Sequence, residues 1–393
     1  NGNILSKIYL EAAAEAGYEI NNDMNGYKQE GFGLMDTTIF DGKRQSTSVT
    51  YLHPIKQRQN LTLITNIQVS KIIIENSSAI GVEIKNKNEL ENIFAEKEVL
   101  LSAGAINSPQ ILMLSGVGPE EELKNHGINV ISALNGVGEN LQDHLETYVQ
   151  YECTKPVTLY SSFNPINMAL IGMQWFLFKK GIAAHSNLEI GGFIRTNEMV
   201  DYPNMQYHFF PSLVIDHGRQ NPSCHAFQAH VGPMRPTSRG FIKLKSSNPI
   251  DSPRIQFNYM QTEHDLNEMR EGIKIARNIF HQKAFDHYRG KEISPGENIN
   301  SDDGLNDFIR SKGDTAYHPS CTCKMGNDDM SVVDQNLKVY GVEKLRVVDA
   351  SIMPNIVSGN LNATTVMIAE KASDLIQNKI TAEKVNIEFY KAS

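Results

Sequence analysis

The chain has 393 residues, more than a single ordinary core requires, so we expect two domains. Hydrophobic residues make up 40% and charged residues 21% of the chain, as in soluble globular proteins. The net charge is -8, and no block of Lys and Arg with interleaved aromatic residues occurs, so nucleic acid is not expected as a partner.

The chain contains four cysteines, Cys153, Cys224, Cys321 and Cys323. They are too few for a disulfide framework, and Cys321 and Cys323 are too close in sequence for an ordinary bridge, which favours a reducing compartment such as the cytoplasm. His318 lies near these two thiols, but a zinc site needs a further ligand at suitable spacing, and the sequence offers none. We therefore predict no metal site.

The first third of the chain shows the texture of an α/β fold. Residues 3–17 predict an amphipathic helix, and residues 59–101 are rich in β-forming residues with turn signals between them. Small residues follow at 102–105, and a helix is predicted from about Ser108 with Pro109 in its first turn. At such a strand-to-helix junction, small residues let the backbone approach a ligand closely.

The texture changes from about 145 to 300, where longer segments alternate like strands and indicate an α+β region. Thr262 predicts the start of a helix, with Asp265 three residues later in a weak capping box. The apolar run at 168–178 is shorter than the roughly 20 residues that cross a bilayer, so we interpret it as a buried or interfacial helix. Peripheral contact with a membrane remains the alternative for this run.

The last part returns to α/β texture, with a strand predicted at 345–354 and a helix at 363–376. His318 precedes a proline, which favours an extended or turn conformation, and Asn362 follows forty-four residues later. Alcohol oxidation needs a group that takes the hydroxyl proton while a hydride leaves the carbon. An imidazole and an amide aimed at one point are suited to that chemistry.

Two motifs resemble those of one enzyme family. The segment GAINSPQILMLSGVG (104–118) is similar to the second signature of the glucose–methanol–choline (GMC) flavoprotein oxidoreductases. The segment HPSCTCKMG (318–326), with Asn362, resembles the family's catalytic His–Asn pair. Further segments resemble family members that act on choline, and the similarity covers residues 3–380; these segments are 136–146, 189–196, 317–326, 330–354 and 358–371.

The resemblance implies a GMC architecture that is α/β plus α+β. A partial, Rossmann-like FAD-binding domain would comprise 1–144 and 311–380, and a substrate domain with an antiparallel sheet flanked by helices would comprise 145–310. Residues 381–393 would form a tail. The implied reaction is FAD-dependent oxidation of choline to betaine aldehyde, or onward to glycine betaine, with a quinone chain or oxygen as electron acceptor.

The resemblance also implies roles for individual residues. His318 and Asn362 match the catalytic pair, and Glu146, His208 and Tyr317 match substrate-binding positions. A quaternary ammonium donates no hydrogen bond, so a carboxylate and aromatic faces would have to hold it.

Further positions match contacts with the cofactor or supply the aromatic faces. The positions that match contacts with FAD are Val69, Asp349, Ala350 and Asn360. Phe209 and Phe210 are candidate aromatic faces beside Tyr317. His144 is a candidate for holding the residues that contact the substrate, without contacting the substrate itself.

The chain also departs from the family pattern. It contains no G-x-G-x-x-G, the motif that cradles the FAD pyrophosphate, and it resembles family members from about a third of the way along. We therefore expect residues 1–393 alone not to bind FAD tightly. Cys321 stands where the family often has Gly, and Leu188 stands where choline oxidases carry a Trp. Two alternatives stay open: a GMC dehydrogenase for a neutral alcohol, and an inactive truncated fragment.

Overall fold

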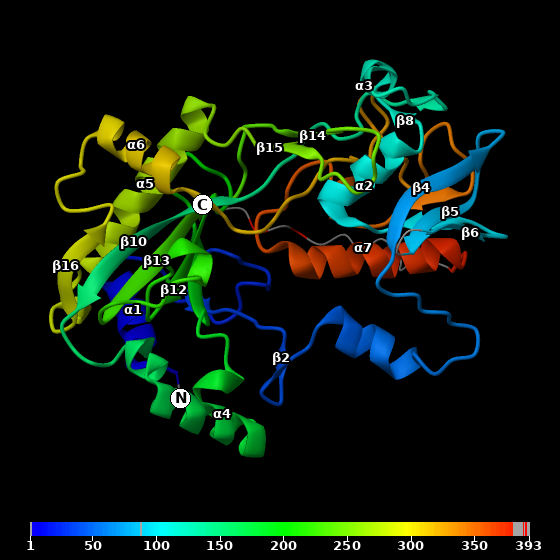
Figure 1. Cartoon of the computed structure of the whole chain (residues 1–393). Helices are drawn as coiled ribbons and strands as arrows, with labels where there is room; N and C mark the ends of the chain where they lie inside the picture. The colour runs from blue at the N-terminus through cyan, green and yellow to red at the C-terminus, as the bar shows by residue number, and fades with distance from the viewer. Residues whose placement is uncertain (1, 87–88, 380–387, 389, 391–393) are drawn as a thin grey trace.

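The structure is a computed structural model that describes residues 2–86, 89–379, 388 and 390. Two lobes lie side by side (Figure 1). One is built around a seven-stranded sheet, and the other around two helices with several small sheets. The tail predicted at 381–393 lies outside the described residues, apart from Glu388 and Tyr390.

The large sheet has the order β1-β11-β12-β13-β10-β16, with β17 added to β10, and all of its pairs are antiparallel. Its strands are β1 (Gly31–Leu34), β10 (Leu145–Cys153), β11 (Ile190–Ile194), β12 (Met205–Phe210), β13 (Ala226–Pro233), β16 (Arg289–Ser294) and β17 (Asp314–Thr315). This sheet confirms the antiparallel sheet predicted for 145–310, and β1 and β17 join it from outside that range.

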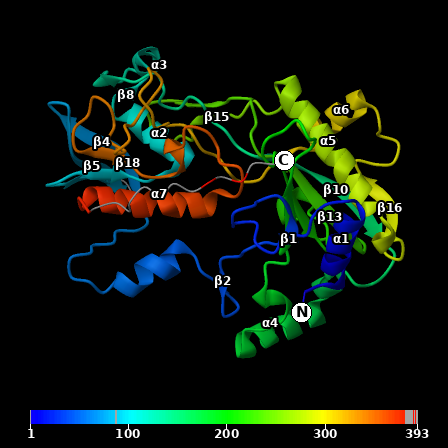
Figure 2. The same cartoon turned by 180° about the vertical axis from the view of Figure 1, so that it is seen from behind.

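The two faces of this sheet differ because successive side chains of a strand point to opposite sides. One face carries polar groups from three neighbouring strands, and the register pairs His208 with His230 across β12 and β13. The other face is apolar and is covered by helices, as the view from behind shows (Figure 2). These helices are α1 (Ile4–Glu15), α5 (Glu263–Phe280) and α6 (Asp302–Lys312).

Helix α1 matches the prediction for 3–17, but its place differs from the expected domain division. Leu5, Tyr9, Ala12 and Ala13 are buried and pack in the core of the large sheet. The contact of Tyr9 with Phe209, with ring centroids 4.7 Å apart, holds the helix there. Residues 4–15 therefore share a core with the expected substrate domain.

The second lobe brings distant segments of the chain together. A parallel pair joins β7 (Val99–Leu101) to β18 (Leu345–Val347), beside the antiparallel sheet of β4 (Gln68–Glu75), β5 (Ser78–Asn86) and β6 (Glu89–Phe94). Helices α2 (Gly104–Leu114) and α7 (Leu361–Ile376) pack in the same core. The helix predicted at 363–376 is thus confirmed, whereas the strand predicted at 345–354 is shorter and leads into a 3-10 turn.

The predicted start of α2 was wrong, because the helix begins at Gly104 and contains Pro109 in its interior. An interior proline leaves the carbonyl four residues earlier without its usual donor. Here that carbonyl, on Ala105, accepts a hydrogen bond from the Thr322 hydroxyl at 2.6 Å. The loop after His318 therefore supplies the partner that the helix lacks.

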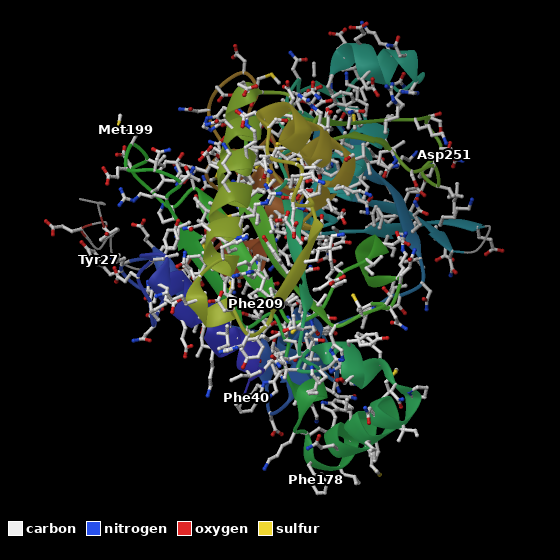
Figure 3. All side chains as sticks on the ribbon, turned by 90° about the vertical axis from the view of Figure 1, so that its left-hand side faces the viewer. Tyr27, Phe40, Phe178, Met199, Phe209 and Asp251 are labelled. Carbon is white, nitrogen blue, oxygen red and sulfur yellow. The ribbon has the colours of Figure 1, made fainter. Side chains whose placement is uncertain are left out.

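Helix α4 (Pro165–Phe178) lies at the surface, so the buried alternative for its apolar run was wrong. None of its residues is buried, and Phe176 is 72% exposed. Phe178 lies at the far end of the molecule (Figure 3). Among the described residues, no helix combines the length and the hydrophobicity that crossing a membrane requires.

The remaining elements are short. They are β2 (Ile39–Phe40), β3 (Lys43–Arg44), η1 (Ser48–Leu52), η2 (His53–Ile55), β8 (Val117–Gly118), α3 (Glu120–Asn125), β9 (Ser132–Ala133), η3 (Leu159–Phe163), η4 (Ile182–Ala184), η5 (Asp216–Gly218), β14 (Phe241–Lys243), β15 (Arg254–Gln256), η6 (Lys283–Phe285) and η7 (Ala350–Ile352).

Candidate active site

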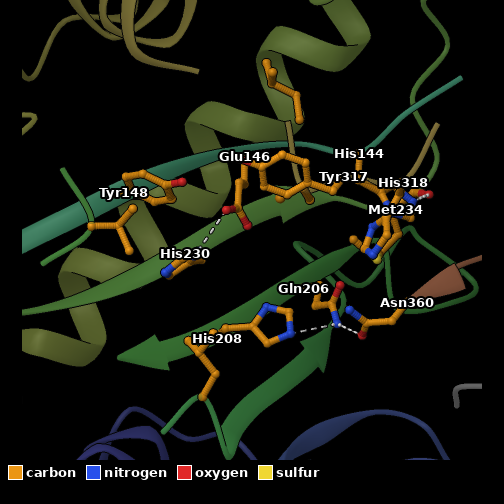
Figure 4. Close-up of a pocket in the computed structure, with 15 residues that line it drawn as sticks. His144, Glu146, Tyr148, Gln206, His208, His230, Met234, Tyr317, His318 and Asn360 are labelled. Carbon is orange, nitrogen blue, oxygen red and sulfur yellow. Dashed lines mark hydrogen bonds and ion pairs between the residues drawn. The ribbon is translucent and has the colours of Figure 1, made fainter. Parts of the chain in front are cut away.

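A cavity of about 290 Å³ lies on the polar face of the large sheet (Figure 4). Strands β10, β12 and β13 form its floor, and the loop at 316–318 and the start of α7 approach from the side. Its polar lining consists of His144, Glu146, Tyr148, Gln206, His208, His230, Tyr317, His318 and Asn360. Imidazoles, a carboxylate, amides and phenols thus converge on one space.

The ring of His318 is oriented by that of His144. The two Nδ1 atoms lie 2.9 Å apart, and Nε2 of His144 lies 2.9 Å from the carbonyl oxygen of Met234. A carbonyl only accepts, so His144 carries its proton on Nε2 and presents a lone pair on Nδ1. His318 therefore donates from Nδ1, and its Nε2 is left as a proton acceptor.

Burial keeps both of these rings neutral. It lowers the pKa of His144 to about 3, and the proximity of His318 acts in the same direction. Burial also lowers the pKa of His318, against a smaller opposing effect of Glu146. Both rings are thus uncharged near neutral pH, and His318 is free to take a proton.

The loop that carries His318 is fixed by Asp143. The backbone N–H of His318 donates to Oδ1 of Asp143 at 2.8 Å, and the Thr315 hydroxyl donates to Oδ2 at 2.6 Å. The Tyr259 hydroxyl donates to the same carboxylate. Between them, Tyr317 adopts a left-handed conformation with φ of 62°. These bonds hold the turn that aims the imidazole into the cavity.

In Figure 4, Glu146 lies on the His230 side of the Tyr317 ring, away from His318. Its Oε1 lies 2.9 Å from Nδ1 of His230. Burial raises the pKa of Glu146, but the hydrogen bonds that its carboxylate accepts from His230 and from the Tyr148 hydroxyl lower it, and the pKa lies below its usual value. The carboxylate is therefore ionised at neutral pH.

His208 lines the same cavity from β12. Burial lowers its pKa to about 4, with a further lowering from His230, so it is neutral at physiological pH. The Gln206 amide donates to Oδ1 of Asn360 at 2.9 Å and lies 3.4 Å from Nε2 of His208. The cavity thus holds an ionised carboxylate together with the neutral rings of His144, His208 and His318.

Comparisons with known proteins identify the family. The model of the GMC oxidoreductase N-terminal domain matches residues 1–146, and that of the C-terminal domain matches residues 236–369. The chain belongs to the GMC oxidoreductase family.

Individual relatives agree with this assignment. The mitochondrial choline dehydrogenase of Mus musculus is 51% identical over 389 residues, which cover 98% of this chain and 65% of that protein. The oxygen-dependent choline dehydrogenase of Acinetobacter baumannii (strain AYE) is 50% identical over 398 residues, covering 100% of this chain and 72% of that protein. The chain thus spans about two thirds of the length of these relatives.

A solved structure shares the fold. An FAD-dependent oxidoreductase from Chaetomium thermophilum superimposes with a TM-score of 0.86 at 26% identity. The match covers 96% of this chain and 72% of that one. The predicted GMC architecture is therefore confirmed.

The residues beside α2 fit part of an FAD. A second cavity, of about 350 Å³, lies next to α2 and includes Val69 in its lining. The carboxylate of Asp349 accepts hydrogen bonds from Gly104 N and from the Ser108 hydroxyl, at 2.9 Å and 2.6 Å. Gly104 has a φ of +83°, and a Cβ there would meet nothing within 4 Å. The strand-to-helix turn is therefore fixed by the hydrogen bonds to Asp349, and the space next to Gly104 is open. The adenosine end of a dinucleotide would need such an open space against the backbone.

The flavin end would lie toward α7. The first helical residues after Asn360 receive no side-chain cap, because the Asn360 amide oxygen is bonded to Gln206 instead. Cys321 donates its backbone N–H to the carbonyl of Ala350 at 3.2 Å, which ties the His318 loop to the second lobe. Cys321 adopts a φ of +75°, a left-handed conformation that Gly would favour.

The structure brings together most, but not all, of the predicted site residues. His318, Glu146, His208 and Tyr317 line one cavity together with Asn360, and Leu188 lies at its edge. Asn362 is exposed on the first turn of α7 and does not line this cavity, so its catalytic role stays a prediction.

Other candidates took different positions from those expected. Phe209 was wrong as an aromatic face for the substrate, because the period of β12 turns it into the apolar core. Phe210 is not in the lining of the described cavity. Sequence reasoning missed Tyr148, Gln206 and His230, although a repeated Gln-x-His on β12 and β13 was a signal that could have found two of them.

Two expectations concern groups that could bind metal or form bridges. The described cysteines, Cys153, Cys224, Cys321 and Cys323, are all free thiols. Within the described ranges, no group of three His, Cys, Asp or Glu side chains is placed to hold a metal ion.

Proposed function

We propose that the protein containing this chain oxidises choline to betaine aldehyde with FAD as cofactor. The observation that carries the proposal is the ionised Glu146 in the same cavity as the free Nε2 of His318. The names of the related choline dehydrogenases from mouse and Acinetobacter baumannii agree with it. The second oxidation, to glycine betaine, would use the hydrated aldehyde, which again presents a hydroxyl.

Glu146 would bind the trimethylammonium group. Its carboxylate is ionised, and the rings of His208 and His318 in the same cavity are neutral, so these two rings add no positive charge that would repel a cation. The rings of Tyr148 and Tyr317 line the same space and would offer aromatic faces to the methyl groups.

His318 would take the hydroxyl proton. Its neutral state and its free Nε2 make it competent as a base near neutral pH. Asp143 and His144 hold its backbone and its ring, so the imidazole is positioned before the substrate arrives. Asn362, on the adjoining turn of α7, is proposed to complete the site from the cofactor side.

FAD, when bound, supplies the acceptor for the hydride that leaves the alcohol carbon. Val69, the Asp349–Ala350 turn and Asn360 are the residues of this chain that would contact it. The uncapped N-terminus of α7 would favour negative charge nearby. Residues 1–393 contain no G-x-G-x-x-G, so the pyrophosphate would need a cradle that this sequence does not provide.

Turnover of the FAD-loaded protein tests the proposal. Choline should be consumed and betaine aldehyde formed, with either oxygen or a quinone analogue as acceptor in parallel assays. A protein that oxidises neutral alcohols as readily as choline would instead support the alternative of a GMC dehydrogenase for neutral alcohols.

We also infer that α4 contacts a membrane surface. A helix that is apolar around its whole circumference is suited to burial, and here none of its residues is buried. Residues 165–180 include no acidic side chain, and they end in Lys179 and Lys180, which would attract anionic lipid headgroups. Sedimentation with anionic vesicles should carry the protein down, and replacing Phe176 and Phe178 by Asp should abolish this. Equal sedimentation of the variant would contradict the inference.

A further inference from the structure

The value of Glu146 for binding a cation depends on the charge of its partner, His230. If His230 were an imidazolium, the pair would carry no net charge and would attract a cation weakly. If His230 is neutral, the pair keeps one negative charge. The hydrogen bond of 2.9 Å between Oε1 of Glu146 and Nδ1 of His230 is compatible with both states, so the other ring nitrogen decides.

That nitrogen faces the side chain of Gln228, which is fully buried. The Gln228 Nε2 lies 2.8 Å from Nε2 of His230. At its other end, Oε1 of Gln228 accepts hydrogen bonds from the backbone N–H of Val214 at 2.8 Å and from the Gln150 amide at 2.9 Å. A backbone N–H only donates, so the amide oxygen must face Val214, and the amide NH₂ must face His230.

The orientation of Gln228 fixes the proton on the imidazole. Because the NH₂ group donates to Nε2 of His230, that nitrogen carries a lone pair and no hydrogen. The ring proton is then on Nδ1 and is donated to Glu146. Protonating the ring would place an N–H against the amide N–H at 2.8 Å in a buried site, which opposes the charged form.

We propose that Gln228 is a specificity-determining residue that keeps His230 neutral, so that the Glu146–His230 pair retains a net negative charge for a cationic substrate. Gln228 is a positioning residue, since it acts through His230 and does not line the cavity. The cationic nature of the substrate rests on the proposed function, whereas the proton placement rests on the contacts alone.

The other groups around His230 are consistent with this arrangement. From β10, Glu146 and the Tyr148 ring face it, the latter with a centroid distance of 4.6 Å. From β12, His208 faces it with a centroid distance of 6.3 Å, and burial keeps that ring neutral. The loop side of the cavity contributes His144 and His318, which are neutral as well. Glu146 is thus the charged group among those facing His230.

The first test needs neither cofactor nor substrate. NMR of the histidine ring nitrogens in the 393-residue chain should show His230 as the neutral tautomer protonated at Nδ1 at neutral pH, with the signal assigned through the His230→Gln variant. An imidazolium signal from His230 in the unmodified chain would overturn the proposal. This measurement does not depend on whether a Gln228 variant folds.

The second test converts the donor at position 228 into an acceptor. In Gln228→Glu, the new carboxylate accepts from Val214 and from Nε2 of His230, so the ring should become an imidazolium beside Glu146. The total charge is unchanged, but the added negative charge lies beyond His230 and outside the cavity lining, whereas the positive charge is next to Glu146 and weakens its attraction for a cation. In the FAD-loaded Gln228→Glu variant, the KM for choline should rise about tenfold. The KM for the uncharged isostere of choline, with carbon in place of the quaternary nitrogen, should change less than about threefold.

The outcomes separate two failures. If the unmodified protein shows no preference for choline over the isostere, the proposed function fails, while the NMR result still decides the role of Gln228. If Gln228→Glu charges His230 and the choline preference is unchanged, the specificity role of Gln228 is overturned.

Discussion

Replacing His144 tests whether the proton position on His318 matters for turnover. In His144→Leu, Nδ1–H of His318 loses its acceptor at 2.9 Å and is left without that partner in a half-buried site. An unsatisfied buried donor costs about 1–3 kcal/mol, and a bias of about 2 kcal/mol toward the wrong tautomer corresponds to a roughly 30-fold loss of kcat. The KM for choline should change less than about threefold, because Glu146 is untouched.

His144→Asn is the matched control. The amide oxygen of Asn can stand where Nδ1 of His144 stands, so it can still accept from His318. Both variants leave the Met234 carbonyl without its donor, so the difference between them isolates the contact with His318. Steady-state kinetics of the FAD-loaded proteins should show most of the kcat retained in His144→Asn. Equal losses in both variants, or a His144→Leu enzyme within about threefold of the parent, would refute the argument.

Three further predictions concern cofactor retention, acid stability and the loop of His318. Purified residues 1–393 should show little flavin absorbance, and stoichiometric FAD would contradict the expectation drawn from the missing phosphate motif. Stability should fall as pH drops below about 6.5 toward 4, because the unfolded chain protonates His144 and His208 while their folded pKa values are about 3 and about 4. The slope of the free energy of unfolding against pH from these two groups should approach about 2.7 kcal/mol per pH unit. Denaturant titrations that give the same free energy of unfolding at about pH 6.5 and about pH 4 would contradict the prediction. Asp143→Asn should lower kcat about tenfold or more, because an uncharged amide with one acceptor oxygen cannot satisfy the donors of His318, Thr315 and Tyr259 together; unchanged turnover would show that this carboxylate does not position the loop.

Local signals in the sequence were sufficient for several elements. Thr262 accepts a hydrogen bond from Asp265 N at 3.2 Å and begins α5, as its position before an amphipathic stretch predicted. Helices α1 and α7 also followed their apolar periodicity. The start of α2 failed because its interior Pro109 depends on Thr322, which lies far away in sequence.

The site was partly predictable for the same physical reason. His318 and Glu146 stand in family motifs, so their residue types and spacing identified them. His230 and Gln228 became part of the site through the pairing of β10 with β13, where Thr147 is opposite Val231. Such register is set by contacts between distant strands, and a shift by one residue would turn those side chains to the other face. Phe209 was misplaced for a local reason, because it directly follows His208 on β12 and successive side chains of a strand point to opposite faces.

The kinetics of Glu146→Gln test most directly that a carboxylate in this cavity binds a cationic alcohol. The Gln oxygen can still accept from His230, so the change removes charge and little else. Two unit charges about 5 Å apart at an effective dielectric constant of about 20 attract by about 3 kcal/mol, which corresponds to a roughly 200-fold change.

The kcat/KM of the FAD-loaded Glu146→Gln variant for choline should therefore fall by about two orders of magnitude. Its kcat/KM for the uncharged isostere of choline should change less than about threefold. A choline kcat/KM that stays within about threefold of the parent would show that Glu146 does not bind the ammonium group.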